Sequence, residues 1–340
     1  MSDESALWAA IQADPQDETL RLAYADWLQE HADPREPWFR SPDVWRWFPV
    51  ADAGLMDWWF GPHEVPPVER IVRQIAKPDP RLGWAAPGHL LSALGSAAVP
   101  RIREWWLESP VERAPNAFGL LDFFQQFPPP KLTAVGTLVK RLKAGTWAEQ
   151  WLAIIDLGHH GPAAAKAVPA LVDLPFHESE WEELYPVPDR HHPHATAFYH
   201  TLGCIGPAAA SAAPVLAQDG WYNGTAYQAL FKIRPDPLVV LEHINDDNNE
   251  DTRLGLDVVQ QLDPTGTDAL VHAVRHHRGR KRYLAAELLG EMGAGAAHVV
   301  PALREVLQGL SENDWDREEA EGMLQWAIKQ LNGETPEPGG

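Results

Sequence analysis

Several features that would identify a particular chemistry are scarce in this sequence. Its 340 residues include one cysteine, Cys204, so an intrachain disulfide is excluded. It has no phosphate-binding glycine loop, no Gly-x-Ser-x-Gly turn, and no His-Glu-x-x-His or paired-cysteine metal motif. No apolar run approaches the roughly 20 residues that a membrane-spanning helix needs. We therefore expect a protein that is not an enzyme, needs no cofactor and does not enter a membrane.

Positive charge is also in short supply. The chain has 28 Lys and Arg residues against 48 Asp and Glu, which gives a net charge of −20. Such an excess of acid disfavours a protein that coats nucleic acid nonspecifically. The N-terminus carries two acidic residues and precedes no apolar h-region of the kind found in signal peptides, so no signal peptide is expected and the predicted location is the cytoplasm.

What the sequence does contain is a repeated motif. Each copy has a Leu-Gly turn followed by a Pro-containing apolar segment, and the three clear copies cover 157–171, 202–216 and 289–303. This pattern predicts the end of one helix, a turn formed by glycine, and a second helix with proline near its first turn. We expect Gly158 and Gly203 to supply the positive φ of that turn.

Weaker copies fill the intervals between the clear ones. Consecutive first helices end about 27–34 residues apart, as two helices of about 11–12 residues with short turns require. One interval is longer because it holds an insertion at 174–194. The pattern predicts an all-α, right-handed α-solenoid of about eight helix pairs over 52–310. A capping helix at 311–332 and a disordered tail at 333–340 are expected to follow.

Two family resemblances agree with this architecture. The Leu-Gly-x-x-Gly-Pro-x-Ala turn, with Val/Ala-Pro-x-Leu downstream, resembles the short HEAT repeats of phycobilisome-lyase type; it is specific in three units and loose in five. Residues 7–35, with the run Leu-Arg-Leu-x-Tyr-Ala-Asp-Trp-Leu, resemble the bacterial repeat-companion domain, which precedes such repeats. That resemblance implies a helical domain over 1–40 and a bacterial origin, and it carries no catalytic residue. The Trp-rich segment 41–61 is then a connector and cap.

Tryptophan is unusually frequent, with 16 residues, several of them adjacent. Neighbouring side chains on a helix point about 100° apart. We expect Trp58 and Trp59 to be mainly core residues, and one of Trp105 and Trp106 to be exposed as part of a binding surface.

The charge is distributed unevenly along the predicted repeats. The predicted second helices together carry +6, so the rest of the chain carries −26. The HEAT resemblance implies that second helices line the concave face, which would then be mildly basic. The candidate binding residues on that face are Arg101, Arg103, Lys131, Lys140, Arg141 and Lys143, beside Trp105 and Trp106. Ordinary solvated helix surface is the alternative interpretation.

The insertion offers two further features. Trp181 and Tyr185 are the predicted anchors for a partner, and shortening the insertion should leave the fold intact. His191, His192 and His194 could bind metal adventitiously, but they lack the ligand spacing of a structural site. His276 and His277 are interpreted as helix-end residues, and no metal site is expected.

Three functions remain compatible with these features. The leading hypothesis is a non-catalytic protein–protein interaction scaffold that holds its partner on the concave face and the 174–194 insertion. The second is a nucleic-acid-binding HEAT protein, similar to HEAT-fold DNA glycosylases, that uses the basic stripe. The third is a regulatory subunit of a bacterial conflict or signalling complex.

Overall fold

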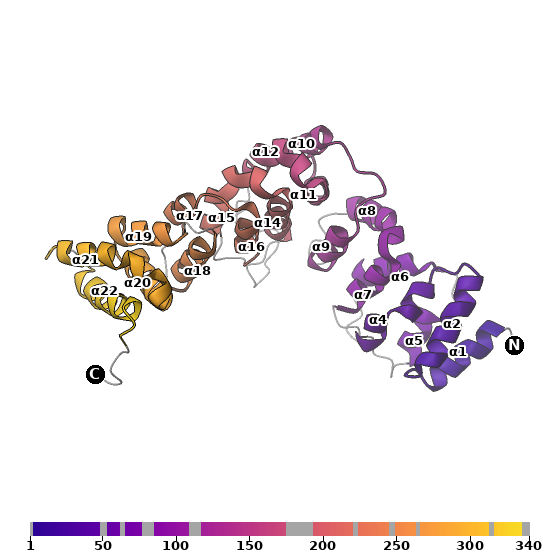
Figure 1. Cartoon of the computed structure of the whole chain (residues 1–340). Coiled ribbons are helices and arrows are strands. Elements are labelled where there is room, and N and C mark those ends of the chain that lie inside the picture. Colours follow the sequence, from indigo (N-terminus) through magenta and orange to yellow (C-terminus); the bar gives the residue numbers. More distant parts are fainter. Residues whose placement is uncertain are drawn as a thin grey trace. The chain divides into compact units, whose positions relative to one another are not determined.

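The structure, a computed structural model, describes residues 3–47, 53–61, 65–76, 85–108, 117–174, 193–219, 224–244, 249–262, 266–312 and 316–334. All regular structure within these ranges is helical, which confirms the predicted all-α class (Figure 1). None of these helices is both long and apolar enough to cross a membrane.

The chain divides into two compact units. Unit 1 comprises Met1–Ala134, Ala144–Asp156 and Glu178–Pro186, and unit 2 comprises Val135–Lys143, Leu157–His177 and Val187–Gly340. Helix α11 (Trp147–His160) contributes its residues up to Asp156 to unit 1. The predicted domain boundaries at 40 and 310 stay predictions.

Unit 1 is an assembly of short helices. They are α1 (Asp3–Ala13), α2 (Glu18–Glu30), α3 (Glu36–Arg40), α4 (Pro42–Trp47), α5 (Ala53–Phe60), α6 (Pro67–Ala76), α7 (Ala85–Leu94), the 3₁₀ segment η1 (Gly95–Ala98), α8 (Val99–Glu108) and α9 (Ala117–Gln126). Helix α7 is central, because α3, α4, α6 and α9 all contact it. Helix α2 begins where the Asp17 carboxylate accepts hydrogen bonds from the backbone N–H groups of Thr19 and Leu20.

Large aromatic side chains fill the core of unit 1. Trp38, Trp59, Trp106 and Trp151 are completely buried, as are several phenylalanines. Trp58 is half-buried beside Trp59, so the expectation that this pair is mainly core holds for Trp59 and in part for Trp58. Buried indole N–H groups need acceptors, and Trp38 and Trp45 donate to the backbone carbonyls of Leu90 and Trp38 at 2.9 and 3.0 Å.

Unit 2 contains helices that alternate between two rows. Its elements are α10 (Val135–Ala144), η3 (Gly161–Ala167), α12 (Val168–Val172), α14 (Pro193–Ile205), η4 (Gly206–Ala212), α15 (Ala213–Asp219), α16 (Gly224–Ile233), α17 (Pro237–His243), α18 (Asn249–Gln261), α19 (Gly266–His276), α20 (Arg280–Glu291), η5 (Gly293–Val299), α21 (Val300–Gly309) and α22 (Arg317–Leu331). In the first row, α14, α16, α18, α20 and α22 each contact the next. In the second row, α15, α17, α19 and α21 do the same. Each helix therefore packs against the helix two places further along the chain. Helix hairpins that stack one on the next show the same pattern of contacts.

The glycine turns of the repeat motif are formed differently from the prediction. Gly158 and Gly203 lie inside α11 and α14, so the expectation that they supply the positive φ is wrong. The left-handed residue is the second glycine of each motif: Gly161, Gly206 and Gly293 have φ of 53°, 70° and 59°. Gly95 is a fourth such residue, with φ of 60°, and it opens η1 in the same way. Each of these glycines ends one helix and begins a 3₁₀ segment that leads into the next.

The first glycine of the motif instead allows close helix packing. A Cβ atom on Gly158 would lie 3.1 Å from Thr201 Oγ1 on α14, and one on Gly203 would lie 3.3 Å from Ala229 Cα on α16. At Gly290 the clash would be worse, at 2.5 Å from the Trp326 ring and 2.9 Å from Ala327 Cα on α22. The end of α11, which packs on α14 at Gly158, thus extends the first row, and these first-row helices approach at positions that only glycine fits without rearrangement.

Candidate functional site

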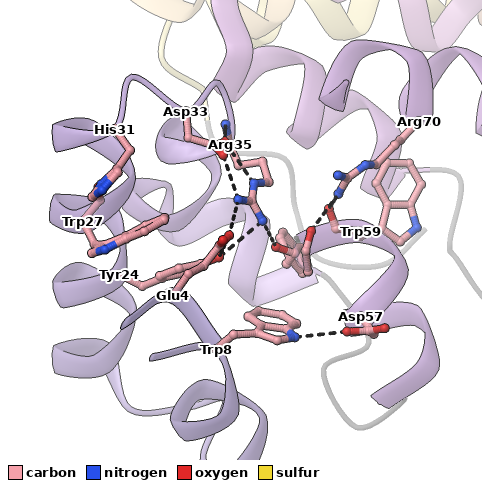
Figure 2. A network of polar contacts seen from close by, with 12 residues as sticks. Glu4, Trp8, Tyr24, Trp27, His31, Asp33, Arg35, Asp57, Trp59 and Arg70 are labelled. Carbon is pink, nitrogen blue, oxygen red and sulfur yellow. Dashed lines mark hydrogen bonds and ion pairs between the residues drawn. The ribbon is translucent and has the colours of Figure 1, made fainter. Parts of the chain in front are cut away.

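A buried polar network connects the first 40 residues to α5. Its centre is Arg35, only 5% exposed, which forms ion pairs of 2.7 Å with both Glu4 and Asp33. The same guanidinium donates to the Tyr24 hydroxyl at 3.3 Å and to the Phe60 carbonyl at the end of α5 at 3.0 Å (Figure 2). Arg35 thus pairs with two carboxylates and a helix terminus at once. These contacts offset the free-energy cost of removing its positive charge from water.

Two other contacts strengthen this junction. The Trp8 indole donates to the Asp57 carboxylate at 3.1 Å, and Figure 2 shows this contact beside the Arg35 cluster. Arg70 is 1% exposed and donates to backbone carbonyls of the chain around the end of α5, with 2.9 Å to Val65 and 3.3 Å to Trp58. The Trp58 carbonyl belongs to the partially negative C-terminal end of α5, which stabilises a guanidinium without a carboxylate, and the Val65 carbonyl adds one more acceptor.

The network changes the acid–base behaviour of its members. Burial raises the pKa of the Tyr24 hydroxyl above its ordinary value, against the effect of Arg35. Burial also opposes ionisation of Asp33, but hydrogen bonds from Arg35 outweigh it, so the pKa of Asp33 is lowered. Burial, together with the charge of Arg35, lowers the pKa of Arg70 to about 10. Every one of these groups is used in structural contacts, and we assign the network a structural role.

Two of the predicted binding arginines, Arg101 and Arg103, are already neutralised within unit 1. Arg101 on α8 lies 3.3 Å from Glu69, 3.4 Å from Glu104 and 3.9 Å from Glu108. Arg103 forms a two-bond ion pair with Asp156, at 2.8 and 2.6 Å, and the Asp156 side chain is 1% exposed. These arginines hold unit 1 together and have little free charge to offer a partner.

The predicted exposure of one member of the Trp105–Trp106 pair is wrong. Trp105 is 3% exposed and Trp106 is completely buried. Their side chains do point in different directions, but α8 is covered on more than one side. The Trp106 ring lies 4.5 Å from that of Trp151 and 5.2 Å from that of Trp147, while α8 also contacts α6. Neither tryptophan is available as a surface anchor.

The remaining predicted cations are exposed. Lys131 lies in unit 1, whereas Lys140, Arg141 and Lys143 lie on α10 in unit 2. Helix α10 buries Val135, Leu138 and Leu142 and has no acidic residue. No ion pair forms with its three cations among the residues that the structure describes. The prediction that all six cations share one face stays a prediction, and Trp181 and Tyr185 lie outside the described residues.

One cluster that the sequence did not predict lies in the second row of unit 2. Glu242 at the end of α17, His272 on α19 and His277 just after α19 each present a potential metal-ligand atom, and these atoms lie within 4.8 Å of one another. Burial lowers the pKa of His277, although Glu242 acts in the opposite direction. The three residues span 35 positions of sequence, and only the packing of α17 on α19 brings them together.

Compared with known proteins, the chain matches no family model, and no curated protein sequence matches it at a significant level. Its function must therefore be inferred from its own residues.

Proposed function

We propose that the chain is a non-catalytic, HEAT-type scaffold that binds an acidic segment of a partner protein through the exposed face of α10. Lys140, Arg141 and Lys143 form what we term the α10 basic surface. The observation that carries the proposal is that these cations are exposed and lack carboxylate partners among the described residues. The cluster is basic although the chain as a whole has a net charge of −20.

Helical geometry supports a shared binding surface. Lys140 and Lys143 are three residues apart and so lie next to each other on α10, whereas Arg141 points about 100° away from Lys140 and extends the exposed basic surface to one side. Leu138 and Leu142, which are buried, occupy the opposite side of the helix. The cations in the last turn also interact favourably with the helix dipole, so a structural benefit exists without a partner. A binding test must therefore measure more than stability.

The rows of stacked helices in unit 2 support the scaffold part of the proposal. In a right-handed HEAT solenoid, α10 would be a second helix on the concave face, where a partner segment could extend along several repeats. A protein ligand is favoured over nucleic acid because three cations would neutralise few phosphates, while the overall charge repels a polyanion.

The proposal can be tested by fluorescence anisotropy with two labelled probes. One is a 20-residue peptide rich in Asp and Glu, and the other is a 20-base-pair duplex DNA. The full chain is titrated into each probe over a range of salt concentrations. We expect the peptide to bind, and its affinity to fall as salt rises, since exposed charges are screened.

Matched variants distinguish the contribution of the α10 basic surface to binding from the effect of net charge alone. The variant K140E/R141E and the control R304E/K329E change the net charge equally, and all four positions are exposed. We expect at least tenfold weaker peptide binding for K140E/R141E and little change for the control. Equal losses in both variants, or binding of duplex DNA in preference to peptide, would contradict the proposal.

A further inference from the structure

We propose that Glu242, His272 and His277 form a binding site for a divalent transition-metal ion, with Zn²⁺ as the ion that best suits the donors. This site is independent of the α10 basic surface. Two imidazoles and one carboxylate are a donor set that zinc accepts readily.

The distances from the two histidines to the Glu242 carboxylate are close to those around a single ion. Zinc bonds to nitrogen and oxygen are about 2.0–2.1 Å long, so a tetrahedral ion holds neighbouring donors roughly 3.3 Å apart. Nε2 of His277 lies 3.3 Å from Oε1 of Glu242, and Nε2 of His272 lies 3.8 Å from the same oxygen. The Glu242 side chain is 53% exposed, so it can make the small adjustment that a bound ion requires.

The backbone beneath these side chains is held firmly. Val240 and Leu241 are buried next to Glu242, and Ala273 and Val274 are buried between the two histidines. The His277 backbone N–H donates to the Ala273 carbonyl at 3.0 Å, and its own carbonyl accepts from Arg282 Nε at 2.8 Å. The donors therefore start from fixed positions, which lowers the entropic cost of assembling a site.

Within the part of the chain that the structure describes, one buried ring nitrogen has only the Glu242 carboxylate near it. Nε2 of His277 is buried and makes no hydrogen bond among the described residues, although the Glu242 carboxylate lies nearby. A buried polar atom without a hydrogen bond is costly, and coordination would satisfy it. The site is open to solvent on the side of Glu242, which gives the ion a route of entry.

The surrounding charges limit the expected affinity. Lys281 is 8% exposed and donates to the Leu241 carbonyl at 3.2 Å. Its ammonium group therefore lies near the cluster, and its positive charge disfavours the binding of a cation. Glu242 is the carboxylate in the set that offsets it. Three protein donors leave one tetrahedral position for water, unlike the four-ligand sites that fold around zinc. We therefore expect an ion that binds with moderate affinity, links α17 to α19 and is not required for folding.

Calorimetric titration of the chelator-treated full chain with Zn²⁺ tests the proposal. We expect the H272Q/H277Q variant to bind one equivalent less than the natural chain, and E242Q to bind that equivalent at least tenfold more weakly. The control H191Q/H192Q removes the adjacent histidine pair of the insertion and should leave this equivalent unchanged. Co²⁺ substitution provides a second readout, because its visible absorption reports tetrahedral coordination.

Circular dichroism must show that each variant is folded before its titration is interpreted. If H272Q/H277Q does not fold, the E242Q variant, which changes an exposed side chain, still tests whether this site binds the ion. Unchanged stoichiometry and affinity in H272Q/H277Q or in E242Q would overturn the proposal. Loss of the equivalent only in H191Q/H192Q would overturn it as well, since the ion would then belong to the insertion.

Discussion

Units 1 and 2 are both helical, but different side chains hold them together. Unit 1 fills its core with indole rings and uses buried arginines, Arg35 and Arg70 among them, to pair with carboxylates and helix ends. In unit 2, first-row helices meet at Gly158, Gly203 and Gly290, and the core is mainly alanine, leucine and valine. Close backbone packing leaves a regular sequence signature, whereas aromatic packing can be achieved with many sequences. This explains why the repeat motif is clear in one unit and hard to recognise in the other.

The tryptophans provide a way to follow the two units separately. Thirteen of the 16 lie within the sequence ranges of unit 1, and only Trp221, Trp315 and Trp326 lie within those of unit 2. Tryptophan fluorescence therefore reports mainly unit 1, while far-UV circular dichroism reports both. A mutation that acts on one unit should change the two signals unequally.

The largest effect is expected for D156A in unit 1. Removing this carboxylate leaves the Arg103 guanidinium largely buried without its counter-charge, which costs about 3–5 kcal/mol. Urea unfolding followed by tryptophan fluorescence measures the change. The double variant R103M/D156L should be less destabilised than D156A, because it leaves no uncompensated charge. A loss below about 1 kcal/mol in D156A would indicate that the aromatic core alone holds unit 1 together.

Three glycines of one motif in unit 2 should respond to alanine in a fixed order. G290A places a Cβ against Trp326 and Ala327, an overpacking that costs about 1–3 kcal/mol. G293A forces a left-handed conformation on alanine, at about 1–2 kcal/mol. Gly295 has neither constraint, so G295A should be neutral or stabilise by up to about 1 kcal/mol. Chemical unfolding followed by circular dichroism ranks the three, and a destabilisation by G295A equal to that of G290A would contradict the assigned roles.

A smaller effect is expected in acid and should be confined to unit 1. Because Arg35 lowers the pKa of Asp33 in the folded state, the stability from this pair is fully present above the unfolded value of 3.8. That stability is lost as pH falls through the lower folded pKa, since the unfolded chain binds the proton more readily. The fluorescence-detected unfolding free energy should therefore fall more steeply below about pH 4 in the natural chain than in D33N. Parallel pH profiles would show that the ion pair contributes nothing.

The smallest effect on stability is expected for K140E/R141E, the variant that should weaken partner binding most. Exposed charges contribute little to folding, so its unfolding free energy should change by less than about 0.5 kcal/mol. The same unfolding experiment checks this. A larger loss would show that α10 depends on its cations for structure, and a reduced peptide affinity could then not be assigned to the binding surface.

The sequence was sufficient for the features that depend on local pattern. Helix type and the turns at 161, 206 and 293 follow from periodicity and glycine spacing, although the positive φ falls on the second glycine and not on the first. The sequence motif alone could not show which glycine allows close helix packing and which takes the positive φ, because both positions are simply glycine in the sequence. Gly95 also fits the second role, with serine at position 92 in place of the first glycine.

The candidate sites depended more on tertiary contacts, which spacing does not reveal. Arg101 and Arg103 were predicted to face a partner because the predicted second helices together carry positive charge, but their counter-charges lie on α6 and α11. The burial of Trp106 likewise depends on Trp147 and Trp151, which are distant in sequence. Glu242 is 30 and 35 residues from the two histidines, so no local motif could have indicated the cluster. The exposure of Lys140 and Arg141, by contrast, was predictable from the apolar spacing of α10.

The four left-handed glycines that open 3₁₀ segments also have a consequence for recombination within the gene. Each places the chain in the same backbone torsion at the same point, between the end of one helix and a short 3₁₀ segment. A deletion that joins the sequence up to and including Gly206 to the sequence after Gly293 would thus preserve the torsion at the junction while removing whole helix hairpins. We expect the glycines to be the natural exchange points at which such a chain is lengthened or shortened during evolution.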